Sequence, residues 1–343
     1  MPKTIPINSL NVASSLGVGW QQQLAQASIT PQSLLKTLGL PLDEFGDFLS
    51  AHKQFSLKAP QAYINKIQAR TPDDPLLLQI MTQSQELLPT DGYNTDPVGD
   101  INASQTPGLL HKYHGRVLLI TTAACAIHCR YCFRRHFPYQ QQQAARDDWQ
   151  DALQYIKQDD SIEEVILSGG DPLVLSDDKL SSLISQLEAI PHLSRLRIHS
   201  RLPVVLPDRI TDDLVNRLSS SRFNVCMVIH ANHANEISEA ETIVLRKLQY
   251  AGIHLLNQAV LLQGINHTLN EQIALSNRLY SAGVLPYYLH LLDPVQGAAH
   301  FEVDEKDASE LISGMRSKLP GFLVPKLVRE IAGEDSKTPA NEL

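Results

Sequence analysis

Apolar residues form two kinds of run along the chain, and the two kinds alternate after residue 116. Short, nearly continuous apolar runs predict β-strands at residues 117–122, 164–169, 196–201, 223–230, 255–262 and 286–292. Stretches with apolar residues at helical spacing predict helices at residues 145–157, 177–190, 211–219, 236–251, 269–283 and 305–319. Six strand–helix alternations favour an α/β fold whose strands pair in parallel through right-handed crossovers. Because a closed barrel needs eight such units, we predict a partial (βα)6 barrel, open on one side, with its active site at the C-terminal ends of the strands.

The chain before this alternation has a different pattern. Apolar residues at helical spacing predict helices within residues 32–40, 61–69 and 75–88. Residues 94–108 are rich in Pro, Gly, Asp and Ser, which is typical of a linker. We therefore expect a helical N-terminal extension and linker (residues 1–100), a barrel core (101–303), and a C-terminal helix with a tail (304–343).

Composition narrows the classes of function. The chain has 343 residues, of which 43% are hydrophobic and 19% charged, and its net charge of −8 argues against a nucleic-acid-binding surface. No apolar run reaches the 18 residues of a membrane helix, and the N-terminal stretch lacks the pattern of a signal peptide. We expect a cytoplasmic protein, in which cysteines stay reduced and do not form a disulfide framework.

Three of the four cysteines lie within eight residues, directly after the first predicted strand. They are Cys125, Cys129 and Cys132 in the sequence CAIHCRYC. Thiolates are soft ligands that suit iron–sulfur clusters or zinc. Three thiolates would leave one iron of a four-iron cluster open to a small chelating molecule. A zinc site completed by His128 or His136 is the alternative.

The spacing CxxxCxxC resembles the signature of the radical SAM superfamily. That resemblance implies a [4Fe–4S] cluster on the three cysteines and S-adenosylmethionine on the open iron. The second predicted strand ends in SGGDP, which is similar to the family motif for the methionine amino group. Two further residues, at the ends of the third and fourth strands, are expected to face this cofactor. The implied S-adenosylmethionine residues are Ser168, Gly169, Gly170, Asp171, Arg201 and His230.

Four longer blocks resemble the lysine 2,3-aminomutase family. They are TPGLLHKYHGRVLLITTAACAIHCRYCFRRHF, SRLPVVLPDRIT, PYYLHLLDPVQGAAHF and GEDSKTP, in the family's order. The resemblance implies a second cofactor, pyridoxal 5′-phosphate, bound covalently to Lys337. A lysine so close to the C-terminus would otherwise be read as a solvated tail residue. We therefore expect the tail to fold back over the barrel mouth. The other implied pyridoxal phosphate contacts are Lys112, Tyr113, Arg116 and Gln258.

The same resemblance implies how a lysine substrate is held. Arg134 is expected to bind the α-carboxylate, for which a planar guanidinium is well suited. Asp293 and Glu330 are expected to face the ε-ammonium group, so that a neutral or acidic side chain would leave buried charges unpaired. L-lysine is therefore the expected substrate.

Some positions depart from the long members of that family. His290 stands where a tyrosine is expected, and Lys112 where an arginine is common. Residues 333–336, GEDS, replace a glycine run, and little chain follows Lys337. These features resemble the short branch, which makes (R)-β-lysine for a ligase that attaches it to elongation factor P. The resemblance also implies a reductant such as flavodoxin or ferredoxin.

Two alternatives stay open at this point. One is an aminomutase for another amino acid, such as glutamate, which requires a cation or an amide opposite the substrate side chain. The other is a non-catalytic module, stabilised by zinc or a cluster, that binds a translation factor.

Overall fold

The computed structural model describes residues 19–139 and 148–340, and its centre is one curved ten-stranded sheet. The strands lie in sequence order, and those from β3 to β9 are parallel to one another. The parallel strands are β3 (Arg116–Thr122), β4 (Glu164–Gly169), β5 (Arg195–Ser200), β6 (Asn224–Ile229), β7 (His254–Val260), β8 (Leu285–His290) and β9 (Lys326–Arg329). The antiparallel edge strands are β1 (Ser104–Thr106), β2 (Leu109–Tyr113) and β10 (Thr338–Pro339). Since β1 and β10 stand at the two ends of the strand order, the barrel is not closed.

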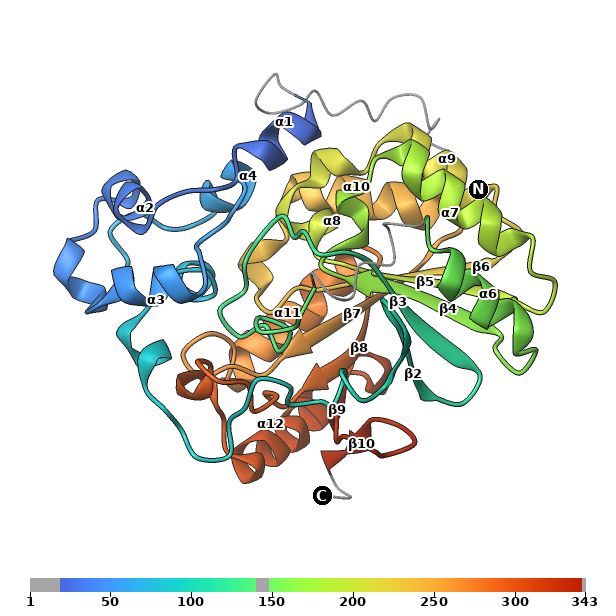
Figure 1. Ribbon diagram of the computed structural model, residues 1–343. Coiled ribbons are helices and arrows are strands. Elements are labelled where there is room, and N and C mark those ends of the chain that lie inside the picture. Colours follow the sequence, from blue (N-terminus) through green and yellow to red (C-terminus); the bar gives the residue numbers. More distant parts are fainter. Residues whose placement is uncertain (1–18, 140–147, 341–343) are drawn as a thin grey trace.

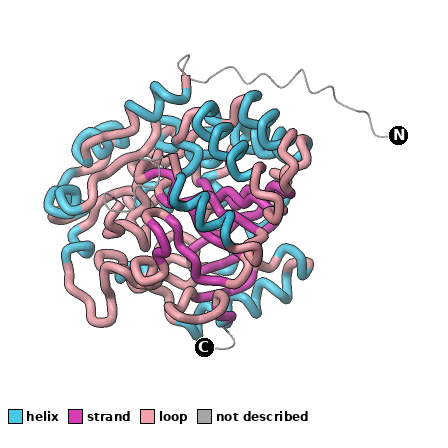
Figure 2. The backbone as a smooth tube through the Cα atoms, turned by 45° about the vertical axis from the view of Figure 1, so that its right-hand side comes forward, coloured by secondary structure: helices cyan, strands magenta, loops and turns pink. Residues whose placement is uncertain are grey.

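The helices that follow the strands cover the outer face of this sheet (Figures 1 and 2). They are α6 (Gln150–Gln158), α7 (Asp177–Glu188), α8 (Leu202–Val205), α9 (Asp212–Ser219), α10 (Glu239–Tyr250), α11 (Leu269–Ser281) and α12 (Glu305–Lys318). Ser176, Thr211, Ser238 and Thr268 each begin a helix by accepting a backbone N–H with the side-chain hydroxyl. Apolar faces of these helices pack on the strands in one continuous core.

The alternation read from the sequence is confirmed for all six predicted strands, within two residues at each end. The predicted helix 145–157 begins outside the described residues and corresponds to α6. The edge strands β1, β2 and β10 and the seventh parallel strand β9 were not predicted. All four are short, and none has the long apolar run that identifies a buried strand.

The N-terminal extension is less helical than its pattern predicts. Its helices are α1 (Trp20–Ala25), α2 (Pro31–Leu38), α3 (Phe48–Gln54), α4 (Gln61–Ile64) and α5 (Pro75–Leu78). A 3-10 helix follows at Ser84–Leu87, so the prediction of helix through residues 75–88 is wrong for residues 79–83. There the chain serves other contacts, because the carbonyl of Gln79 accepts the backbone N–H of Arg130 at 2.9 Å. Tertiary packing against the cysteine loop overrides the local helical pattern.

Residues 94–108 are not a linker, which corrects the interpretation drawn from their composition. Asn94 forms a parallel bridge with Val295, in the segment after β8, and residues 104–106 form β1. Asp96 accepts the backbone N–H groups of Asp100 and Ile101, which shapes a tight loop. The polar residues of this segment therefore build a loop that packs beside the barrel mouth.

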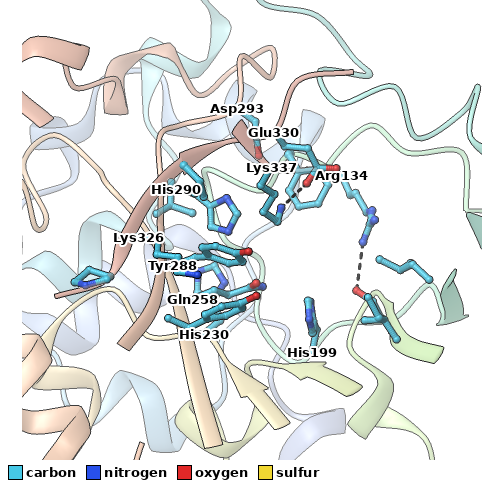
Figure 3. A pocket seen from close by; sticks show the side chains of 18 of the residues that line it. Arg134, His199, His230, Gln258, Tyr288, His290, Asp293, Lys326, Glu330 and Lys337 are labelled. Atoms are coloured by element: carbon cyan, nitrogen blue, oxygen red, sulfur yellow. Dashed lines mark hydrogen bonds and ion pairs between the residues drawn. The ribbon is translucent and has the colours of Figure 1, made fainter. Parts of the chain in front are cut away.

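The C-terminal tail returns to the sheet after α12. Strand β10 pairs antiparallel with β9, with Thr338 opposite Arg329. This hairpin places Lys337 beside Glu330 (Figure 3). Within residues 19–139 and 148–340, no helix is both long and apolar enough to cross a membrane.

Candidate active site

One cavity of about 1230 Å³ opens at the C-terminal ends of the parallel strands. The three clustered cysteines line it, and so does Lys337, although more than 200 residues separate them in sequence. Every site residue inferred from the sequence lines this same cavity: Cys125, Cys129, Cys132, Lys112, Tyr113, Arg116, Arg134, Ser168, Gly169, Gly170, Asp171, Arg201, His230, Gln258, Asp293, Glu330 and Lys337. The structure therefore brings the predicted residues together, and their contacts show what each can do.

The cysteine loop is fastened to the end of β4 by backbone contacts. Gly170 N–H donates to the carbonyl of Thr122 at 2.7 Å, and Asp171 N–H donates to that of Ala124 at 2.8 Å. A Cβ atom at Gly170 would lie 2.3 Å from the Ala124 carbonyl oxygen. Glycine is therefore required here because two backbones touch, whichever ligand occupies the cavity.

The N-terminal extension holds the same loop from its other side. His128 N–H donates to the carbonyl of Lys58, and Arg130 N–H donates to that of Gln79, both at 2.9 Å. Arg130 also forms a fully buried ion pair with Glu86. Breaking such a pair leaves an uncompensated buried charge, which costs roughly 3–5 kcal/mol. Residues 58–86 therefore act as a brace for the cysteine loop.

A cation lies directly against one of the three thiols. Arg201 Nη1 is 2.6 Å from Cys129 Sγ, and its Nη2 donates to Gln79 and to Glu236. The thiolate is the form of cysteine that binds metals. Burial, and then the neighbouring Cys129, raise the pKa of Cys132 to about 11. The thiols repel one another as thiolates, so a positively charged metal centre between them would offset both effects.

Asp171 and His230, two of the residues expected at S-adenosylmethionine, already have partners in the protein. Asp171 accepts hydrogen bonds from the Ser200 hydroxyl and from the backbone N–H groups of Arg201 and Leu202, which joins the ends of β4 and β5. His230 stacks on Tyr131, and burial together with Arg201 lowers its pKa to about 3. His230 is therefore neutral at physiological pH and offers the cavity an uncharged ring.

A chain of ion pairs crosses the opposite side of the cavity, and Figure 3 shows its pair between Lys337 and Glu330. Lys337 Nζ donates to Glu330 at 2.6 Å, and Lys112 Nζ donates to the other oxygen of Glu330 at 2.8 Å. Lys112 also lies 2.6 Å from Asp100, whose second oxygen accepts from Arg134 Nε at 2.6 Å. Burial alone would raise the pKa of Glu330, but Lys337 and Lys112 hold it well below its usual range. Glu330 is therefore ionised beside Lys337 and Lys112.

Asp293 is the acidic residue of the cavity that lacks a partner. Its Oδ1 atom is buried and accepts no hydrogen bond from the residues that the structure describes. Burial first, and then the neighbouring Glu330, raise the pKa of Asp293 to about 7. A buried carboxyl group without a donor is costly, and an ammonium group entering the cavity would satisfy it.

Aromatic rings form the wall beside Lys337. Gln258 on β7 stands opposite Tyr288 on β8 in the sheet register, and the Tyr288 ring lies 6.0 Å from Lys337 Nζ. His290 is buried edge-on against Tyr288, and burial together with Lys337 lowers its pKa well below the usual value. Figure 3 shows these rings facing the Lys337 side chain from the strand below it.

Comparison with known proteins agrees with this geometry. Residues 119–255 match the family model of the radical SAM superfamily. An L-lysine 2,3-aminomutase of Haemophilus influenzae is 48% identical over 319 residues, covering 93% of this chain and 94% of that protein. This chain belongs to the lysine 2,3-aminomutase family of radical SAM enzymes. The family member from Escherichia coli is 47% identical, with 93% of this chain and 94% of that protein covered.

A longer relative gives the scale of divergence within the aminomutase family. The L-lysine 2,3-aminomutase of Clostridium subterminale is 36% identical, and the match covers 93% of this chain but 77% of that protein. Among solved structures, a radical SAM methyltransferase from Sphaerobacter thermophilus aligns with a TM-score of 0.48 and 15% identity, over 64% of this chain and 68% of that one. That distant likeness carries no argument here.

Membership of the radical SAM family implies a [4Fe–4S] cluster and S-adenosylmethionine, and the cysteine end of the cavity fits them. The three thiols line one wall and are backed by Arg201. In the described residues, no three His, Cys, Asp or Glu side chains converge on a point that a single metal ion could occupy. A four-iron cube is wider than one ion, so its ligands need not converge. His128 and His136, the candidate fourth zinc ligands, do not line this cavity and contact the carbonyls of Ser56 and Gln296 instead.

The tail end of the cavity also fits a pyridoxal phosphate group. It offers a primary amine, aromatic walls and a cation for the phosphate. That cation is Arg116, which lies over the Tyr113 ring and forms no ion pair with any carboxylate that the structure describes. Lys112, which is also expected at the phosphate, lies between Asp100 and Glu330.

Sequence reasoning missed several residues of this cavity. Asp100 lies in the supposed linker, where no periodic pattern could identify it. His199 and Tyr288 are on strands β5 and β8 and line the cavity, and His199 Nε2 is buried without a partner among the described residues. The rule that active sites lie at the C-terminal ends of strands could have identified His199, which is the last residue but one of β5.

Proposed function

We propose that this enzyme moves the amino group of L-lysine from the α-carbon to the β-carbon and releases (R)-β-lysine. The observation that carries the proposal is that the cysteine triplet and the amine of Lys337 line one cavity, with Arg134 on one side and an acidic pair on another. Two reactive centres must share one enclosed space if a radical formed at one is to act on a substrate held at the other.

The polar groups of the cavity match a substrate with one carboxylate and two amino groups. Arg134 is buried, and Asp100 binds only its Nε. Its terminal nitrogens, of which Nη1 makes one long contact with the Ser168 hydroxyl, would receive the substrate carboxylate. Asp293 and Glu330 would receive the ε-ammonium group. Asp293 Oδ1 accepts no hydrogen bond from the described residues and would gain one when that ammonium enters.

The cofactors supply the reactive chemistry, and the chain positions them. When bound, the cluster and S-adenosylmethionine would supply a carbon-centred radical, and pyridoxal phosphate on Lys337 would delocalise the unpaired electron of the substrate. The cluster would be held by Cys125, Cys129 and Cys132. The residues that would surround S-adenosylmethionine are Ser168, Gly169, Gly170, Asp171, Arg201 and His230. Arg116, Tyr113, Gln258 and Lys112 would surround the pyridoxal phosphate. The neutral rings of His230 and His290 keep extra charge away from the reacting atoms.

One anaerobic experiment tests this activity. The protein is reconstituted with iron, sulfide, S-adenosylmethionine, pyridoxal phosphate and L-lysine, then reduced, and the products are separated by chiral chromatography. We expect (R)-β-lysine. Release of 5′-deoxyadenosine without any β-lysine would refute the substrate assignment and leave radical formation intact.

The residues facing the side chain of the substrate distinguish the alternatives. An aminomutase for glutamate would need a cation or amide where Asp293 and Glu330 stand. A zinc-stabilised binding module would contain zinc and would retain no pyridoxal on Lys337 after reduction with borohydride. Peptide mapping of the reduced protein therefore separates catalysis from a purely structural metal.

We further propose that the product serves the β-lysylation of elongation factor P in the cytoplasm. Support comes from the relatives of similar length, since the matches with the Haemophilus and Escherichia proteins cover 94% of each. Deleting the gene should remove the β-lysyl mass from elongation factor P, and added (R)-β-lysine should restore it. An unchanged mass after deletion would refute this link. Flavodoxin and ferredoxin are the reductants to compare in the activity assay.

A further inference from the structure

The carboxylate of Asp100, which no sequence pattern identified, lies at the centre of the ion-pair chain. Asp100 is only 1% exposed, and it lies in the loop that Asp96 shapes. The loop is packed closely on the tail, since a Cβ atom at Gly99 would lie 3.0 Å from the Cβ of Ala332. Asp100 is thus fixed between the barrel mouth and the segment that leads to Lys337.

The two oxygens of Asp100 serve two different cations. One accepts from Arg134 Nε at 2.6 Å, and the other lies 2.6 Å from Lys112 Nζ. Lys112 is held further by Glu330 and by the carbonyl of Val98, both at 2.8 Å. The Lys112 ammonium therefore fixes Asp100, which in turn fixes one edge of the Arg134 guanidinium.

The remaining contacts of Arg134 show why its orientation depends on Asp100. Among the residues that the structure describes, the guanidinium makes, besides its bond to Asp100, a long 3.3 Å contact with the Ser168 hydroxyl and lies over the Phe133 ring at 4.8 Å. Neither of these two contacts fixes the orientation of the planar guanidinium. The charged hydrogen bond from Nε to Asp100 does fix it. Because Asp100 occupies Nε, the Nη1 and Nη2 edge is left for a carboxylate in the cavity.

We propose that Asp100 is a positioning residue, which orients Arg134 so that its free edge meets the carboxylate of the amino-acid substrate. The proposal rests on the function proposed above. It assigns to the loop of residues 96–101 a share in substrate recognition, at the end of the substrate opposite Asp293.

The test compares two ligands that differ in the carboxylate. L-lysine and 1,5-diaminopentane both carry the amine that reacts with pyridoxal phosphate, but only L-lysine carries a carboxylate. Binding of each is followed anaerobically by the change in cofactor absorbance of the pyridoxal-loaded protein, without S-adenosylmethionine. Asp100→Asn keeps the size and one acceptor of the side chain but removes its charge. The matched control is Asp91→Asn, at an exposed residue that precedes the loop of residues 96–101.

We expect Asp100→Asn to weaken L-lysine binding about tenfold or more, because a hydrogen bond to a charged group contributes roughly 1.5–3 kcal/mol. Binding of 1,5-diaminopentane should change little, and Asp91→Asn should leave both ligands unaffected. Asp100→Glu, which keeps the charge, should recover part of the affinity for L-lysine. If Asp100→Asn does not fold, Asp100→Glu should still weaken L-lysine binding while sparing the diamine.

Two results would overturn the inference. Equal weakening of both ligands, together with a lower thermal unfolding midpoint or less pyridoxal per chain, would mean that Asp100 only stabilises the fold. Unchanged L-lysine binding in Asp100→Asn would mean that Arg134 needs no such support. If the unmodified protein itself bound no L-lysine, the proposed function would fail as well.

Discussion

The cysteine loop and the tail that carries Lys337 line one cavity, but the chain holds them by different means. The loop donates backbone hydrogen bonds to the carbonyls of Lys58 and Gln79 and accepts others from the residues after β4, and a buried ion pair lies behind it. The tail is held by the two-residue strand β10 and by the contact of Lys337 with Glu330, and residues 331–336 are exposed. Rigid ligands suit a cluster that must stay in place, whereas under the proposed function Lys337 would release its cofactor when the substrate binds.

Substitution of a clustered cysteine should have the largest effect. Cys125→Ala, Cys129→Ala or Cys132→Ala removes one of three ligands, so we expect loss of bound iron and of β-lysine formation. Iron content and the electron paramagnetic resonance signal of the reduced protein measure the first effect. Cys226→Ala is the matched control, because Cys226 is on β6 and does not line the cavity. Normal iron content in a cysteine-loop variant would contradict the assignment.

Substitution of Lys337 should abolish turnover without disturbing the cysteine end. Lys337→Ala removes the amine, so pyridoxal phosphate can no longer attach to the chain. Iron content should match the unmodified protein, because the loop is braced independently of the tail. Lys318→Ala, at an exposed residue at the end of α12 that does not line the cavity, is a control for general damage. Loss of iron in Lys337→Ala would show that the two ends depend on each other.

The same contrast explains what the sequence could predict. The six buried strands follow from apolar runs, and the cysteine spacing indicates a metal site without help from the fold. Lys337 has no local signal at all. Its position depends on the pairing of β9, which has four residues, with β10, which has two. Strands this short leave no pattern in the sequence from which their pairing could be predicted. The role of Asp100 is still harder to predict from the sequence, because it depends on contacts with Arg134 and Lys112 that no local pattern indicates.

A smaller effect is expected from the acidic pair. Asp293→Asn should weaken L-lysine binding on the order of 30-fold at pH 8, since leaving a buried charge without its partner costs roughly 2 kcal/mol or more. Norleucine, which lacks the ε-amine, should lose no affinity from the same substitution. Cofactor absorbance again reports binding. Equal losses for the two ligands would place Asp293 away from the ε-ammonium.

The pH dependence of binding should be the smallest effect and the most specific. Because burial and Glu330 raise the pKa of Asp293 to about 7, its carboxyl is largely protonated at pH 6 and ionised at pH 8. Only the ionised form pairs with an ammonium group, so the affinity for L-lysine should rise roughly tenfold from pH 6 to pH 8 and level off above that. Glu330, whose pKa is lowered, stays ionised throughout, and His230 stays neutral.

Asp293→Asn and norleucine are the controls for this profile. In the variant, the rise in L-lysine affinity between pH 6 and pH 8 should disappear. With norleucine and the unmodified protein, the part of the profile due to Asp293 should also vanish, which separates it from titration of the amine that reacts with the cofactor. A rise that persists in Asp293→Asn would assign the titration to another group. The ammonium end would then be recognised by Glu330 alone, and the tail would supply both the cofactor lysine and the recognition of the side chain.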